Sequence, residues 1–150
     1  MNRNPLALDG TAMPPNLLLM AKVLAVVFLL SGQWALLPER FLPFFGVLDD
    51  LGSPALFRIA LQVVFLVAAA RLLMNSTPRA SSFVLGAVIL SGMLASRQYV
   101  ENNRFYTALL FLLAGLSDRR SGAVLIRWQV VVMYFGAALN KLLDADWRSG

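Results

Sequence analysis

AVLIRWQVVVMYFGAALNKLLDADWRSG, residues 123–150, indicates the architecture of the whole chain. Its first part is about twenty mostly apolar residues, the length that an α-helix needs to cross the core of a bilayer. One amide, Gln129, lies within that run, and the run ends abruptly in a polar cluster. The members of this cluster are Asn140, Lys141, Asp144, Asp146, Trp147 and Arg148. The pattern predicts a membrane helix whose polar end is a functional site.

Composition supports a membrane protein. Apolar residues make up 59% of the 150 residues and charged residues 14%, against about 45–50% and about 25% in soluble domains. The chain has neither cysteine nor histidine, which excludes disulfides, thiolate metal sites and the commonest general base, and we expect no metal site. The net charge of +5 comes from basic residues scattered at the ends of apolar blocks. That placement is typical of anchoring at a membrane interface and not of nucleic-acid binding.

The apolar residues fall in five blocks, which predict an all-α membrane protein, a bundle of about five transmembrane helices. The expected spans are residues 17–37, 54–73, 80–95, 105–116 and the run that begins at 123. Residues 1–16 are expected to form a lead-in, and 17–150 a single helical membrane domain. The fourth block has only twelve residues, which is short for a span. We expect its helix to begin near 100–104, with those polar residues facing protein.

Local signals refine three of these spans. Ser53 followed by Pro54 is typical of a helix start, with the serine as N-cap. The third span is rich in Gly and Ser, which allow helices to approach closely in lipid, so we place it inside the bundle. Lys22 in the first span either extends to the membrane interface or is a buried cation facing the bundle.

Charge distribution gives a weak indication of orientation. The basic residues divide almost evenly between the two membrane faces. The compact Arg119-Arg120 loop is typical of a cytoplasmic loop, which favours a cytoplasmic location for the face that carries it. We therefore expect the N-terminus in the cytoplasm, and the expected location of the chain is the bacterial inner, or cell, membrane.

The polar groups concentrate on one face whichever way the chain is inserted, because the connections 38–53 and 97–104 and the tail 140–150 share that face. On the last helix Gln129 and Asn140 lie on one stripe, and Tyr134 and Lys141 on the next. Lys141 is the candidate general base, if desolvation lowers its pKa. The alternative is a span-end lysine paired with Asp144 or Asp146. Further candidate binding residues are Asn103, Arg104, Tyr106, Gln129, Tyr134, Asp144, Asp146 and Trp147.

Two segments resemble the signature of the vitamin K-dependent γ-carboxylase-like, or HTTM, membrane domain. The first has an aromatic pair, a small-residue step, a Lys-Leu and an Asp-Trp before a glycine, here Tyr134-Phe135, Ala137-Ala138, Lys141-Leu142, Asp146-Trp147 and Gly150. The second is the Asn-rich helix start Asn102–Tyr106, followed by a leucine-rich run. The order of the apolar blocks also fits, so the resemblance covers most of the chain. Because family members continue past this motif, the resemblance implies either the N-terminal part of a longer protein or a pared-down relative.

The resemblance implies a reduced quinone, such as vitamin K hydroquinone, as cofactor, and a lysine at the position of Lys141 that deprotonates it. The family's histidine after the paired asparagines is replaced by Arg104, and one extra leucine separates Lys141 from Asp144. The family's outer domain is not among the 150 residues. We therefore expect this chain alone to bind lipid or quinone-like molecules and not to carboxylate glutamate.

Two other functions are compatible with the sequence. One is a non-enzymatic membrane scaffold or subunit, whose polar cluster docks a protein partner. The other is a fragment of a small transporter, in which Gln62, Gln129 and Lys22 line a path.

Overall fold

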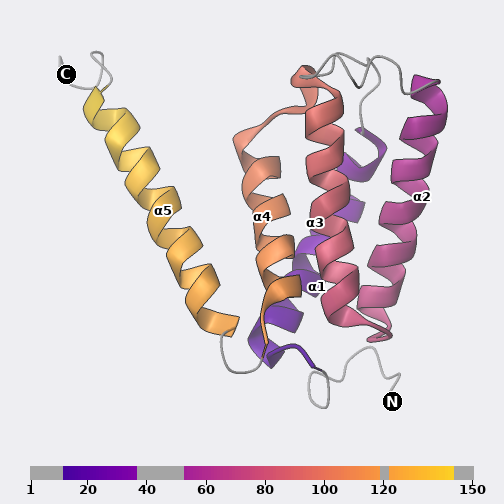
Figure 1. Ribbon diagram of the computed structural model, residues 1–150, viewed down its shortest axis with the longest axis horizontal. Coiled ribbons are helices and arrows are strands. Elements are labelled where there is room, and N and C mark those ends of the chain that lie inside the picture. Colours follow the sequence, from indigo (N-terminus) through magenta and orange to yellow (C-terminus); the bar gives the residue numbers. More distant parts are fainter. Residues whose placement is uncertain (1–11, 37–52, 119–121, 144–150) are drawn as a thin grey trace.

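The computed structural model describes residues 12–36, 53–118 and 122–143. These residues are helical, with no strand among them, and form α1 (Pro15–Leu30), η1 (Gln33–Leu36), α2 (Pro54–Leu73), α3 (Pro78–Ala95), η3 (Arg97–Tyr99), α4 (Asn102–Leu116) and α5 (Gly122–Leu143). Successive α-helices run in opposite directions, and α5 diverges from the other four (Figure 1). The expected all-α class is confirmed.

Fewer helices than expected are long and apolar enough to cross a membrane. Within the described residues, α2 and α3 are each long and apolar enough to cross a membrane, and α1 is apolar but shorter. The bundle of five spans therefore stays a prediction, while the coarser expectation of long apolar helices is confirmed.

The first helix is shorter than the predicted span 17–37, because α1 ends at Leu30. Gly32 adopts the left-handed conformation with φ +68°, and its N–H donates to the carbonyl of Leu29. A glycine in this conformation closes a helix. The prediction was wrong here because the apolar run continues past this signal in the sequence.

The second helix begins where the sequence indicates, with Ser53 as N-cap and Pro54 as the first helical residue, although the serine makes no side-chain cap hydrogen bond. Its end is set by Asn75, which has φ +56°. The Ser76 N–H donates to the Arg71 carbonyl and the Asn75 N–H to the Leu72 carbonyl. This is the Schellman arrangement, and it turns the chain tightly into α3.

Helices α3 and α4 form the tightest pair of the molecule. A Cβ added at Gly86 of α3 would lie 2.6 Å from the Ala108 carbonyl oxygen, and one added at Gly115 of α4 would lie 2.6 Å from the Phe83 nitrogen. The buried Ser82 hydroxyl donates to the Phe111 carbonyl at 2.9 Å. Small residues thus bring the two backbones into contact, as expected for a third span inside the bundle.

One arginine fastens the same pair at the end where α3 begins. The Arg79 Nε donates to the Gly115 carbonyl at 3.3 Å and its Nη2 to the Leu116 carbonyl at 3.2 Å. The last carbonyls of α4 have no acceptor role within their own helix, so this side chain satisfies them from the neighbouring helix.

Many large apolar side chains are exposed on the outer surface of the helices. Large apolar side chains on α2 that are exposed include Leu56, Ile59, Val63, Val64, Leu66 and Val67. In contrast, the buried set includes serines and charged residues as well as a core around Phe65, Phe111 and Leu85. Lys22 belongs to this buried set, which agrees with the alternative of a cation facing the bundle.

Candidate functional site

The start of α4 is built around a buried guanidinium. Arg104 donates from Nη1 to the Tyr99 carbonyl at 3.2 Å, and its guanidinium carbon lies 4.3 Å from the centre of the Tyr99 ring. Its Nε lies 3.6 Å from the Glu101 carboxylate. A side chain in the first turn of a helix points back over the preceding segment, which here is η3. Arg104 is therefore engaged in holding the α3–α4 connection.

Burial also perturbs the aromatic partner of this arginine. Tyr99 is 3% exposed, and its hydroxyl finds no hydrogen-bond partner within the described residues. Burial raises the pKa of Tyr99 to about 12, against the lowering effect of Arg104 and together with the raising effect of Glu101. The phenol thus stays neutral over the physiological range. No motif or spacing in the sequence marks Tyr99 or Glu101 as functional residues.

The expected inward orientation of the α4 start holds for only part of it. Arg104 is buried, whereas Asn102 and Asn103 are exposed. The Asn103 carbonyl accepts a hydrogen bond from the Thr107 hydroxyl at 2.8 Å. The prediction that this polar segment faces protein is wrong for the two asparagines, because the first turn of a helix presents its residues to different sides.

Helix α5 is linked to α4 by an amide that the sequence analysis identified. Gln129 donates from Nε2 to the Tyr106 carbonyl at 3.1 Å. Its Oε1 is buried and has no partner within the described residues. Two of the candidate residues, Gln129 and Tyr106, are thus brought together, through the backbone of the second.

The remaining candidates are not shown to join them. Tyr134 and Lys141 are exposed on α5, and Figure 1 shows the carboxyl end of α5 level with the start of α4 but on a diverging axis. Asp144, Asp146 and Trp147 lie outside the described residues. The clustering of Lys141 with Asn103 and with the Asp-Trp motif stays a prediction.

A cavity of about 360 Å³ lies beside the polar start of α4. All of its lining residues are apolar, namely Leu90, Met93, Leu94, Val100 and Phe105. Cavities of roughly 300–1,000 Å³ are the size that small ligands occupy. Sequence reasoning missed this cavity because its walls come from the end of one helix and the beginning of the next.

The cavity suits the apolar body of a quinone-like lipid but does not fit carboxylase chemistry. Its walls come from α3 and the start of α4, whereas Lys141 lies on α5. None of the five residues that line the cavity carries a titratable group. No proton transfer to or from a quinone is therefore assigned to these residues.

Comparison of the chain with protein-family models, with curated proteins and with solved structures finds no match.

Proposed function

We propose that the chain is an integral membrane helical domain of the γ-carboxylase-like kind, which serves as a lipid-embedded scaffold and does not carboxylate glutamate. The observation that carries the proposal is the distribution of side chains across the helices. Large apolar residues lie outside on α2, and small or hydrogen-bonding residues lie between α3 and α4.

This distribution is favourable in lipid and costly in water. Exposed apolar patches on soluble monomers are rarely larger than a few hundred Å², and six large apolar side chains are exposed along α2 from Leu56 to Val67. Lipid tails give no hydrophobic drive for helix association, so membrane helices associate through close backbone approach and interhelical hydrogen bonds. Gly86, Gly115 and the Ser82–Phe111 bond supply both.

Cysteine labelling tests the spanning arrangement directly, because the natural chain has no cysteine. Ser53 and Ser76 are exposed and lie at the two ends of α2. In bacterial spheroplasts we expect a membrane-impermeant maleimide to label Ser53→Cys and to leave Ser76→Cys unlabelled. Disruption of the membrane should make both reactive.

The outcomes of this labelling separate the parts of the proposal. Labelling of both variants in intact spheroplasts, or recovery of the chain in the soluble fraction, would exclude a membrane span at α2. Labelling of Ser76→Cys alone would keep the span and reverse the orientation.

A second candidate function, binding of a quinone-like lipid, is favoured by the apolar cavity beside α4. The cavity lies next to the Asn-rich segment that carries part of the family resemblance. The apolar part of the occupant would be held by the walls from Met93, Val100 and Phe105. Binding and catalysis are separable here, because binding needs only the cavity.

The catalytic expectation is negative. Purified protein supplied with reduced vitamin K, oxygen, labelled bicarbonate and a glutamate peptide should incorporate no label. Positioning of two reactants contributes about 7–11 kcal/mol in well-organised sites, and the described residues offer no converging base and peptide-binding groups. Incorporation of label that disappears in Lys141→Ala would refute the non-catalytic assignment.

A further inference from the structure

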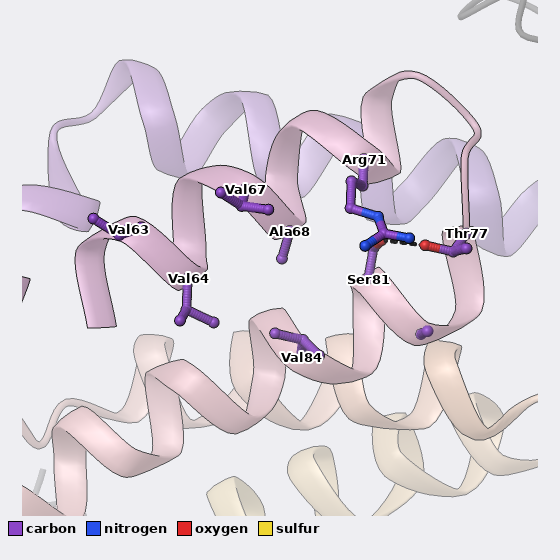
Figure 2. A pocket seen from close by; sticks show the side chains of 9 residues that line it. Val63, Val64, Val67, Ala68, Arg71, Thr77, Ser81 and Val84 are labelled. Carbon is purple, nitrogen blue, oxygen red and sulfur yellow. Dashed lines mark hydrogen bonds between the residues drawn. The ribbon is translucent and has the colours of Figure 1, made fainter. Parts of the chain in front are cut away.

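A groove of about 290 Å³ lies between α2 and α3, on the side away from the α4 contact (Figure 2). Its length is lined by small and branched apolar side chains, namely Val63, Val64, Val67, Ala68, Ala80 and Val84. The volume is near the lower limit of ligand cavities. It therefore suits part of one hydrocarbon chain and not a whole lipid.

One end of the groove is polar. Arg71, Thr77 and Ser81 gather there, from the last turn of α2, the turn and the first turns of α3 (Figure 2). The Thr77 and Ser81 hydroxyls lie 3.2 Å apart and share one hydrogen bond. Because two hydroxyls carry two protons, one O–H is left to donate to a ligand oxygen. The Arg71 side chain is exposed and directed to the same end.

The position of this polar end is fixed by the backbone. In the Schellman turn after α2, the Ser76 N–H donates a hydrogen bond to the Arg71 carbonyl at 2.9 Å. This turn holds the start of α3 against the end of α2. The neighbouring Arg79 is already bound to the α4 carbonyls. Arg71 is thus the arginine at this turn whose guanidinium faces the groove.

The lining of the groove favours an amphiphile whose head group carries a negative charge. An apolar channel ending in a guanidinium and a hydroxyl pair complements a hydrocarbon chain ending in a phosphate. Basic pockets between membrane helices on the cytoplasmic side bind anionic lipid headgroups. The Arg119-Arg120 motif predicts a cytoplasmic location for the end of α4, which lies at the same end of the molecule as the α2–α3 turn (Figure 1).

We propose that the α2–α3 groove is a binding site for an anionic phospholipid, with one acyl chain along the valines and the phosphate on Arg71 and the Thr77–Ser81 hydroxyls. The site rests on the proposed membrane location of the chain. It differs from the cavity beside α4, which has neither a cation nor a hydroxyl in its lining.

Native mass spectrometry of the full chain in mild detergent tests the site, with phosphatidylglycerol as the anionic probe and phosphatidylcholine as the zwitterionic one. We expect tighter binding of phosphatidylglycerol, and a loss of about fivefold in its affinity in Arg71→Gln, since one arginine near a headgroup contributes about 1 kcal/mol. Arg58→Gln, on the same helix at its other end, is the matched control and should bind as the natural chain does.

A second pair of variants tests the acyl channel. Val64→Trp should fill the groove and weaken both lipids several-fold, whereas Ile59→Trp, exposed on α2 but not lining the groove, should not. Equal affinity for the two lipids, unchanged binding in Arg71→Gln or in Val64→Trp, or displacement of the lipid by millimolar inorganic phosphate would each overturn the proposal. The maleimide labelling of Ser53→Cys and Ser76→Cys reports separately on membrane insertion, so a failure of either hypothesis is identified.

Discussion

Replacing Gly86 by valine should destabilise the helical bundle by about 3 kcal/mol, the upper part of the range for overpacking a close contact. The added Cβ would lie 2.6 Å from the Ala108 carbonyl oxygen, 2.7 Å from the Leu112 Cγ and 2.8 Å from the Leu112 nitrogen. Two of these three atoms belong to the backbone, so relief requires α3 and α4 to move apart. Movement of that kind would also strain the Ser82–Phe111 hydrogen bond.

Thermal unfolding in detergent, followed by circular dichroism, measures this effect. A loss of about 3 kcal/mol corresponds to a fall of roughly 10 °C in the midpoint for a chain of this size. Ala60→Val, which places the same branched residue on the exposed face of α2, should unfold near the natural temperature. If Gly86→Val and Ala60→Val unfold together, close α3–α4 packing does not hold the molecule.

Raising the pH from about 9 to about 13 should cost the folded protein about 2–3 kcal/mol of stability through Tyr99. Its pKa is raised from 10.0 to about 12 in the folded chain, and each pKa unit corresponds to about 1.4 kcal/mol. Below pH 10 the phenol is neutral in both states, and its contribution to stability is fully present. As the pH rises through this window only the unfolded chain ionises, so stability falls until the folded pKa is passed.

The variant Tyr99→Phe isolates this contribution. The ring under Arg104 is kept, and a hydroxyl without a partner within the described residues is removed. Stability at pH 8 should therefore be unchanged, and the alkaline loss should be smaller than in the natural chain by about 2–3 kcal/mol. Tyr134→Phe, at an exposed position, is the control that should retain the full loss. Identical alkaline curves for Tyr99→Phe and the natural chain would show that Tyr99 is accessible.

Helix boundaries can be predicted where adjacent residues carry a signal for the start or the end of a helix. Ser53-Pro54 placed the beginning of α2 correctly, because capping geometry depends on adjacent residues alone. The end of α1 was missed although Gly32 marks it, because hydropathy was given more weight than a single glycine. The small residues of the third span indicated its interior position, since close approach in lipid leaves a compositional trace.

The site was less predictable because it depends on relations between elements. Gln129 was identified from its isolation in an apolar helix, and it does bond to α4. The burial of Arg104 depends on the position of η3 beneath the guanidinium. The helical periodicity of the sequence does not predict that position. Helical periodicity gives the face of Lys141 but not the angle at which α5 leaves the bundle, so the relation of Lys141 to Asn103 could not be obtained.

The described helices differ in length, and in the proposed membrane setting this has a consequence for the bilayer itself. Helix α2 has 20 residues, about 30 Å at 1.5 Å per residue, whereas α4 has 15, about 22 Å. The hydrocarbon core is about 30 Å thick, so a span at α4 would be in hydrophobic mismatch, which is accommodated by local thinning of the bilayer, by snorkelling side chains or by oligomerisation. Arg104 at the start of α4 is buried and donates to the Tyr99 carbonyl. Local thinning of the bilayer beside α4 would bring the aqueous phase closer to the cavity lined by Val100 and Phe105.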